Sequence, residues 1–279
     1  MLLAAASAFL FGAMTVALRF PLSRGADPAA GSLLTVVPAI LVTLPFVAAT
    51  GVDVGGLWLF ALAGLLGPGL SQLFFTFAVR DAGPSRTSVV VGTAPLFSVA
   101  IALAFLNEPL DAALLLGALL IVAGGVLLAS ERGRPGHVKT IGLLLALGAT
   151  LVFATRDNLV RWLSGDTHVA PPLAAATTLA AGALVVAAYL VLSRTPVPTR
   201  AIAGFVPAGI CFGLSYVCLF EAYYRGRVTV VSPIIATESL WGVALSILLL
   251  RHTELVGRRV VLGAALIVGG GVLIGIYAG

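Results

Sequence analysis

Long apolar runs follow one another along the whole chain, and short breaks rich in charged residues, glycine and proline separate them. A helix needs about 20 apolar residues to cross the hydrocarbon core of a bilayer. With the breaks placed where charges, Gly and Pro cluster, the pattern predicts ten spans, at residues 2–19, 30–50, 56–79, 85–106, 111–130, 140–163, 169–192, 201–224, 228–250 and 257–277. No break is long enough for a soluble domain, so we predict an all-α polytopic membrane protein.

The chain contains an internal repeat. Residues 117–128 are identical to residues 263–274 at nine of twelve positions, with a spacing of 146 residues. Near the start of each half, Phe11 matches Phe153 at a spacing of 142 residues. Charged and polar residues follow the same slowly drifting register, so composition alone does not explain the match. We interpret the chain as two copies of a five-helix unit.

Five is an odd number, so the second copy must enter the membrane from the opposite face. We expect residues 1–133 to form the first repeat and residues 134–279 to form the second. Transporters commonly have such inverted repeats, with the substrate site near the bilayer midplane between them. The sequence therefore predicts ten transmembrane helices in two inverted five-helix repeats, within one membrane domain.

The composition excludes several classes of soluble protein. Apolar residues make up 60% of the chain and charged residues only 10%, against about 45–50% and about 25% in soluble domains. The net charge of +5 comes from basic residues scattered through the breaks, which form no patch for nucleic acid. The sequence contains no metalloprotease, serine-hydrolase or nucleotide-binding motif. This argues against a membrane-embedded enzyme, and we expect no metal and no cofactor.

Both halves carry the same ordered motifs. The first half has a proline-containing segment at residues 93–97, an Asn-Glu turn within residues 106–110 and a glycine pair at residues 124–125. The second half has the corresponding segment at residues 234–241, with Ser239 where proline is usual. In order, number and spacing, these motifs resemble the drug/metabolite transporter superfamily in its ten-helix EamA-type branch. Size and composition are similar to those of bacterial amino-acid exporters of the YddG type.

The resemblance implies a secondary transporter in the bacterial inner membrane that exports small metabolites, with amino acids as the favoured class. Substrate would pass by alternating access through a central cavity between the repeats. The alternatives are an exchanger of sugar phosphates or nucleotide sugars, and a multidrug exporter. The first of these needs two or more basic residues at the midplane, where the sequence offers only Arg156.

The expected partners are the lipid bilayer and a small-molecule substrate, with coupling to protons as a further possibility. We expect a monomer, and the alternative is a homodimer through the glycines of the fifth and tenth helices.

The breaks differ in positive charge. The odd-numbered breaks carry 12 Lys and Arg residues, whereas the even-numbered breaks and the adjoining span ends carry 4. By the positive-inside rule, this difference places the odd-numbered breaks in the cytoplasm and both termini outside. The family resemblance implies the reverse, with both termini inside.

Ionisable residues inside spans are the first candidates for chemistry, because a charge at the bilayer centre costs about 2.5–3.5 kcal/mol on insertion scales. Glu238 lies at the middle of its predicted span. We expect it in the cavity, as a proton carrier or as the partner of a substrate ammonium, and the alternative is a carboxyl group held by a hydrogen bond inside the bundle. Arg156 and Asn158 are also predicted to line the cavity, with snorkelling to the interface as the alternative. Arg19 and Arg161, which occupy matching positions, are expected to snorkel.

Polar and aromatic side chains complete the predicted cavity. They are Ser239, Trp241, Tyr216, Gln72, Phe75, Thr76 and Thr15. Helix-breaking residues inside spans are predicted to be hinges for alternating access, because membrane helices tolerate them only where neighbouring groups satisfy the backbone. They are Gly67, Pro68, Gly69, Pro95, Pro207 and Pro233.

Overall fold

The computed structural model describes residues 1–105, 112–129, 138–165, 167–250 and 257–277. Every regular element in these ranges is a helix, because a single apolar segment satisfies its own backbone hydrogen bonds in lipid only as a helix. The elements are α1 (Leu2–Ser23), α2 (Pro28–Thr50), α3 (Leu57–Gly64), η1 (Leu65–Leu70), α4 (Ser71–Ala82), α5 (Pro84–Val91), α6 (Ala94–Phe105), α7 (Ala112–Ala129), α8 (Thr140–Leu163), α9 (Pro171–Leu192), η2 (Thr199–Ala201), α10 (Ile202–Arg225), α11 (Val228–Ile235), α12 (Glu238–Leu249) and α13 (Arg258–Tyr277). Of these, η1 is a π-helical turn and η2 is a 3-10 turn.

Each of the ten predicted spans corresponds to one helix or to a run of consecutive helices. Among the described residues, eight of these are long and apolar enough to cross a membrane, and Leu116–Leu127 within α7 is a shorter apolar stretch. The predicted all-α membrane fold is thereby confirmed. The predicted boundary between the repeats, at residues 133 and 134, and the turn motif at residues 106–110 lie outside the described residues.

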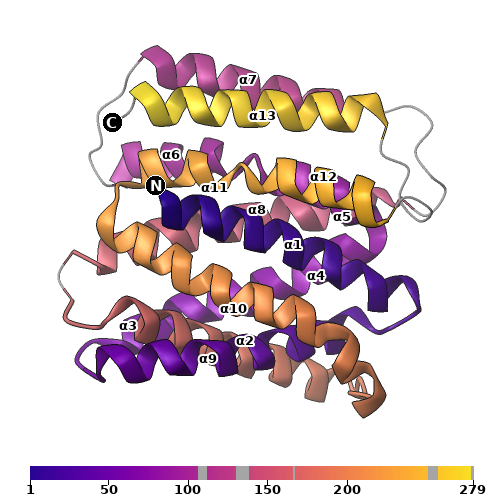
Figure 1. The fold of residues 1–279 in the computed structure, drawn as a ribbon, viewed down its shortest axis with the longest axis vertical. Coiled ribbons are helices and arrows are strands. Elements are labelled where there is room, and N and C mark those ends of the chain that lie inside the picture. The colour runs from indigo at the N-terminus through magenta and orange to yellow at the C-terminus, as the bar shows by residue number, and fades with distance from the viewer. Residues whose placement is uncertain (106–111, 130–137, 166, 251–256, 278–279) are drawn as a thin grey trace.

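The helices run side by side, so their ends form two faces (Figure 1). The start of α1 and the end of α13 lie at one of these, here called the terminal face. The end of α1 and the start of α8 lie at the other, here called the opposite face. The α7 and α13 helices lie along one edge of the bundle, α2, α3 and α9 lie along the other, and α1, α8 and α10 run between them (Figure 1).

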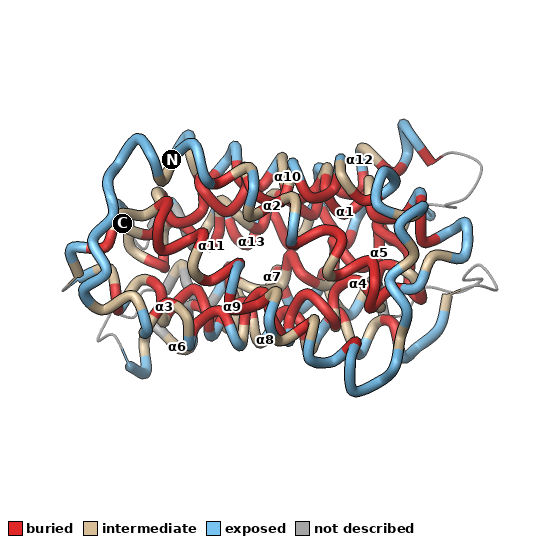
Figure 2. The backbone as a smooth tube through the Cα atoms, turned by 90° about the horizontal axis from the view of Figure 1, so that it is seen from below, coloured by how far each residue is buried: buried red, intermediate tan, exposed pale blue. Residues whose placement is uncertain are grey.

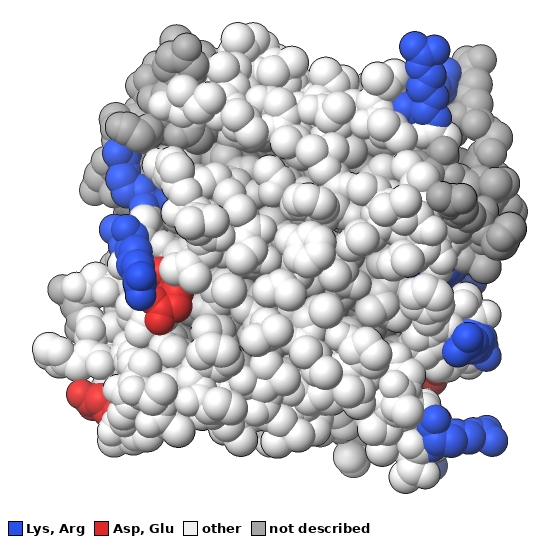
Figure 3. All heavy atoms as spheres, in the orientation of Figure 1, with Lys and Arg blue, Asp and Glu red and all other residues white. Residues whose placement is uncertain are grey.

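Charge and burial are distributed as a bilayer requires. Charged side chains gather at the two faces, and the broad band between them is uncharged on the side shown in Figure 3. Buried residues lie toward the inside of the bundle and exposed residues lie at the loops and on the outer surface (Figure 2). Large apolar side chains on that outer surface, such as Leu41, Val122 and Leu184, are suited to contact with lipid.

The fourth and ninth spans are broken in the middle, at equivalent positions of the two repeats. Gly92 and Thr93 separate α5 from α6, and Ala236 and Thr237 separate α11 from α12. At each break the threonine hydroxyl donates to a backbone carbonyl oxygen of the preceding half-helix, at 2.6 Å for Thr93 and 2.7 Å for Thr237. Each of these carbonyl oxygens also accepts the backbone N–H of the same threonine, at 3.0 Å for Thr93 and 3.1 Å for Thr237, so the threonine closes the last turn of the half-helix twice. Two helix N-termini therefore lie inside the bundle, an arrangement that is also found in transporters with discontinuous helices.

The predicted hinge residues lie at the helix breaks, in η1 and inside the continuous helix α10. Pro95 is in the first turn of α6 and Pro233 is in the last turn of α11, so these two flank the helix breaks. Residues 67–69 lie in η1, where Gly67 has non-helical backbone angles (φ −133°, ψ 113°). The α10 helix, in contrast, continues through Pro207 without a break, because neighbouring groups in a membrane bundle can satisfy the carbonyl that a proline leaves free.

The α7 and α13 helices pack closely through their glycines, and the contacts are repeated by symmetry. A Cβ atom at Gly124 would lie 2.6 Å from the carbonyl oxygen of Gly263, and a Cβ atom at Gly270 would meet the carbonyl oxygen of Gly117 in the same way. Small residues allow this approach where lipid provides no hydrophobic drive between helices. These glycines therefore pack the two helices against each other within one chain.

Arg19 is buried inside the bundle, so the expectation that it snorkels is wrong, and Arg161 is half-buried. Arg19 Nη1 donates to the carbonyl oxygens of Val79 (3.4 Å) and Arg80 (2.9 Å) near the end of α4. Arg161 Nη1 donates to the carbonyl oxygen of Tyr223 (3.2 Å) near the end of α10. Val79 and Tyr223 are equivalent positions of the two repeats. The last carbonyls of a helix are unpaired and carry partial negative charge, so they bind a guanidinium group well.

Candidate functional site

A small cavity lies where the two broken spans meet α1, α8 and α10. Its walls are formed by Ser7, Phe11, Val91, Ala94, Phe153, Arg156, Asp157, Ser215, Leu219, Ile235 and Glu238. Val91 and Ala94 flank one helix break, and Ile235 and Glu238 flank the other. The cavity volume is about 30 Å³, which is room for one or two water molecules.

The aromatic wall of the cavity is formed by equivalent residues of the two repeats. Phe11 and Phe153, which are equivalent residues, meet edge to face with their ring centroids 5.7 Å apart. Phe75 stands behind them, 5.1 Å from Phe11 and 6.1 Å from Phe153. Phe75 does not itself line the cavity. It supports the two rings that do.

Arg156 and Asp157 form an ion pair inside the bundle. Arg156 Nη2 and Asp157 Oδ1 are 2.6 Å apart, and Nε of the same arginine donates to that oxygen at 2.7 Å. Both residues are nearly inaccessible, at 4% and 5% exposed. Because a buried charge must be paired and hydrogen-bonded, this geometry rules out snorkelling for Arg156. Both residues face the cavity, although neighbours in sequence are about 100° apart on a helix.

Two tyrosines of α10 form hydrogen bonds with this ion pair. Tyr223 Oη donates to Asp157 Oδ2 at 2.8 Å, and Arg156 Nη1 donates to Tyr216 Oη. Tyr216 and Tyr223 are seven residues apart, which places both on one face of a helix. Tyr216 was predicted from the sequence to line the cavity, and the structure places it behind Arg156 instead.

Asp157 is a charged cavity residue that was not predicted from the sequence. The available signal was chemical, because an arginine inside a span needs a counter-charge and the next residue supplies one. Ser7 and Ser215 were missed as well, and their hydroxyl oxygens are 3.0 Å apart in the cavity wall.

Glu238 is the first residue of α12 and follows the helix break directly. It is 4% exposed and shares the cavity wall with Arg156 and Asp157. The N-terminus of a helix carries partial positive charge, which favours a carboxylate at this position. Within the part of the chain that the structure describes, no basic side chain forms an ion pair with Glu238, because Arg156 is bound to Asp157. The cavity thus combines one basic residue with two carboxyl groups.

Several residues predicted for the cavity lie behind its wall. Gln72 and Thr76 are fully buried in α4 and bond to each other, with Thr76 Oγ1 2.8 Å from the Gln72 carbonyl oxygen. The hydroxyls of Thr15 and Ser239 donate to carbonyl oxygens of their own segments, at 2.8 Å and 2.9 Å. Asn158 Nδ2 donates to the carbonyl oxygen of Ser98 at 3.1 Å and so joins α8 to α6. The bonds of Thr15, Ser239 and the Gln72–Thr76 pair stay within their own segments, whereas the Asn158 bond joins two helices.

Trp241 points away from the cavity, contrary to the prediction. It is 43% exposed and its ring packs edge to face against Phe9, with the centroids 5.1 Å apart. The reason is the close approach of α1, because a Cβ atom at Gly12 would lie only 2.8 Å from the Cβ atom of Trp241. The indole ring therefore has room only on the outer side of the bundle.

Comparison with known proteins agrees with this architecture. The family model of the EamA-like transporter family matches the chain twice, over residues 1–130 and 140–276. A solved structure described only as "Crystal structure of protein" has the same fold, with a TM-score of 0.72, 22% sequence identity, and coverage of 99% of this chain and 96% of that chain. No curated protein matches the chain.

The two family matches correspond to the two halves that the internal repeat defined. Together they cover nearly the whole chain, including every described helix that contributes to the cavity. The chain therefore belongs to the EamA-like transporter family and is a multi-pass membrane transporter of small molecules.

Proposed function

We propose that the chain is a secondary transporter of the bacterial inner membrane that exports small amine-bearing metabolites, with amino acids as the first candidates. The observation that carries the proposal is the cavity between the repeats, where Glu238, which has no ion-pair partner among the described residues, lies beside the Arg156–Asp157 pair. An amino acid brings an ammonium group for Glu238 and a carboxylate for the hydrogen-bonding groups around Arg156. Its aliphatic or aromatic part fits the walls formed by Phe11, Phe153 and Leu219.

The charges in the cavity wall argue against the sugar-phosphate alternative. Two carboxyl groups and a single arginine line the cavity, and the arginine is already paired. A phosphate dianion would bring two negative charges and no ammonium group to this wall, whereas the ammonium group of an amino acid balances its own carboxylate and can bind Glu238. The same wall suits an apolar cation. The transport assay must therefore distinguish an amino-acid exporter from a multidrug exporter.

Alternating access is supported by the position of the helix breaks. A cavity of about 30 Å³ must widen before it can hold a metabolite, and pockets that bind small molecules are about 300–1,000 Å³. The breaks at Gly92-Thr93 and Ala236-Thr237 flank the cavity at equivalent positions of the two repeats. We propose that these breaks and η1 are the hinges about which half-helices move.

The test is counterflow in proteoliposomes preloaded with single compounds. The panel consists of amino acids, sugar phosphates and cationic drugs, and Glu221→Gln is the matched control because this carboxylate bonds to Arg225 on its own helix, outside the cavity. We expect exchange of one or more amino acids by the parent and the control, and loss of exchange in Glu238→Ala. Exchange of sugar phosphates alone, or of cationic drugs alone, would replace amino acids as the substrate class.

A further inference from the structure

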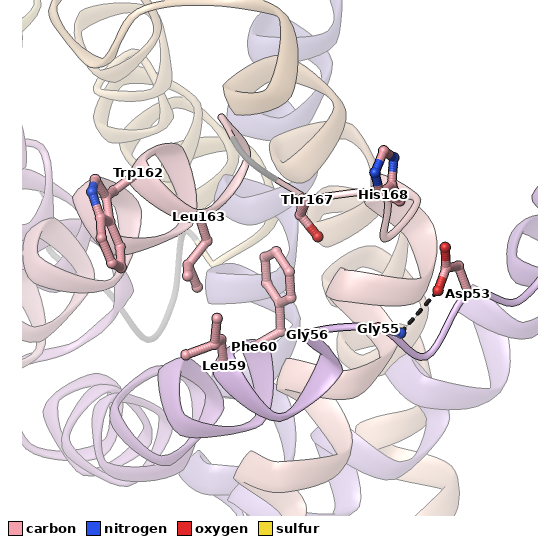
Figure 4. A pocket seen from close by; sticks show the side chains of 9 residues that line it. All are labelled: Asp53, Gly55, Gly56, Leu59, Phe60, Trp162, Leu163, Thr167 and His168. Carbon is pink, nitrogen blue, oxygen red and sulfur yellow. Dashed lines mark hydrogen bonds between the residues drawn. The ribbon is translucent and has the colours of Figure 1, made fainter.

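A second and larger pocket opens at the terminal face, between the loop before α3 and the end of α8. Its volume is about 400 Å³, which lies within the range of small-molecule sites. It is lined by Asp53, Gly55, Gly56, Leu59, Phe60, Trp162, Leu163, Thr167 and His168 (Figure 4). None of these residues lines the cavity between the repeats, and none was predicted as a site from the sequence.

The pocket has a polar end and an apolar end. Asp53, Thr167 and His168 lie together on one side of Figure 4, and Leu59, Phe60 and Leu163 lie toward the other. Trp162 forms the far edge. This arrangement fits a molecule that carries a polar head on an apolar body.

The polar end is suited to a cation. Asp53 Oδ1 accepts a hydrogen bond from the backbone N–H of Gly55 at 2.9 Å, which fixes the carboxylate and leaves Oδ2 for a ligand. The Thr167 hydroxyl oxygen accepts from the backbone N–H of Val169 at 3.1 Å. No lysine or arginine is among the lining residues, and the polar side chains beside Asp53 are those of Thr167 and His168.

The pocket and the central cavity are both lined by residues of α8. Leu163 follows Asp157 by six residues, which is about 9 Å of helical rise. Phe60, Val160 and Leu163 belong to one continuous buried core that also contains Leu219 and Tyr223. Packed apolar side chains therefore separate the outer pocket from the charged cavity in this conformation.

We propose that this pocket is a second binding site, which takes a primary ammonium group on an apolar body at the terminal face. The ammonium binds Asp53 and the apolar body packs on Phe60, Leu163 and Trp162. The site is a vestibule for the transported amine, and this part of the proposal rests on the proposed function. The same ammonium chemistry is carried by a free amine and by a phosphatidylethanolamine headgroup, and the experiment separates the two.

The experiment is a tryptophan-fluorescence titration of the full chain in nanodiscs of phosphatidylcholine and phosphatidylglycerol, lipids without a primary amine. Phenethylamine is the probe and phenylacetate is its anionic counterpart. We expect a saturable change with phenethylamine and none with phenylacetate. Trp162→Phe should remove the signal, and Asp53→Asn should weaken binding about fivefold, the size of a partly exposed ion pair. Glu221→Gln, which also removes a carboxylate at the terminal face, should bind as the parent does.

A second set of nanodiscs contains phosphatidylethanolamine. Loss of the phenethylamine signal in these discs assigns the site to a lipid headgroup, and an unchanged signal assigns it to the free amine. The proposal is overturned if binding is not saturable, if phenylacetate binds equally well, or if Asp53→Asn binds like the parent. The counterflow assay keeps the two proposals apart. Normal amino-acid exchange without binding at this pocket removes only the second site, whereas binding here without exchange of any amine removes the proposed function and the vestibule role and leaves the binding site.

Discussion

Lys139, at the start of α8, binds Asp81, at the end of α4, through both its side chain and its backbone. Lys139 Nζ lies 3.2 Å from Asp81 Oδ1, and the backbone N–H of Lys139 donates to the Asp81 carbonyl oxygen at 2.8 Å. Asp81 is only 4% exposed and is also paired with Arg80. The contact joins the two halves of the chain at the opposite face. At the equivalent position of the second half, Arg225 pairs with Glu221 on its own helix instead.

This asymmetry predicts that the Lys139–Asp81 pair holds the opposite face closed. Lys139→Glu places a second negative charge against Asp81 and should open the seam between α4 and α8. Ser85 is fully buried at the same end, so a Ser85→Cys variant reports opening by its reaction with a membrane-impermeant maleimide. We expect faster labelling in Lys139→Glu, and a return toward the parental rate when Asp81→Lys is added. Equal labelling rates in all variants would exclude this role for the ion pair.

We expect the charges of the Arg156–Asp157 pair to be needed for transport but not for stability, provided that both are removed together. Asp157→Asn leaves Arg156 as a buried charge without its counter-ion, and we expect a loss of about 3–5 kcal/mol in stability. The double variant Arg156→Met, Asp157→Leu removes both charges and should unfold close to the parental temperature, because apolar residues often replace buried ion pairs without loss. It should not transport. Thermal unfolding in detergent and counterflow check the two parts, and transport by the folded double variant would contradict the assignment.

Glu238 is expected to be the residue that makes transport depend on pH. Its carboxyl group lies at the α12 N-terminus in the cavity wall and has no basic partner among the described residues. Glu238→Gln keeps the shape of the side chain but cannot exchange a proton. We expect a flat pH profile of transport in this variant, and a parental profile in Glu221→Gln. If Glu238→Gln transported at full rate with unchanged pH dependence, Glu238 would have no part in coupling.

The close packing of α7 against α13 predicts that alanine substitutions at two neighbouring glycines of α13 differ sharply in their effect on stability. A Cβ atom at Gly270 would collide with the backbone at Gly117 and with Leu120, whereas a Cβ atom at Gly269 meets nothing within 4 Å. Gly270→Ala should therefore lower stability by about 1–3 kcal/mol through overpacking. Gly269→Ala should be neutral or stabilising, because alanine favours a helix over glycine. Thermal unfolding of the two variants in the same detergent is the measurement, and equal melting temperatures would contradict the close packing.

The membrane fold was predictable from the sequence because its determinants are local or repetitive. Any segment of about 20 apolar residues must be helical to satisfy its backbone in lipid, so hydropathy alone located the spans. The repeated glycines of residues 117–128 and 263–274 showed the two-fold organisation. Glu238 stood out because a carboxyl group in the middle of an apolar run has a high cost unless the fold provides for it.

The residues that line the cavity could not all be predicted from the sequence, because contacts between residues far apart in the chain decide which side chains face it. Helical spacing alone put Arg156 and Asp157 on different faces, but a long arginine side chain bends back to reach its neighbour when Tyr216 and Tyr223 lie opposite. Trp241 was predicted to face inward, and only the approach of α1 at Gly12 excludes its ring from the cavity.

The sequence by itself determined that this chain crosses the membrane as helices, repeats once and carries very few charges inside its spans. Only the tertiary structure decided which of those charges meet. Hydropathy acts on each segment separately, whereas the partners of Arg156, Arg19 and Asp81 are brought in by other helices or by a distant part of the chain. Pairing of buried charges is a property of packing between helices: Arg19 and Arg156 bind groups on other helices of their own half, and Lys139 reaches Asp81 from the other half of the chain.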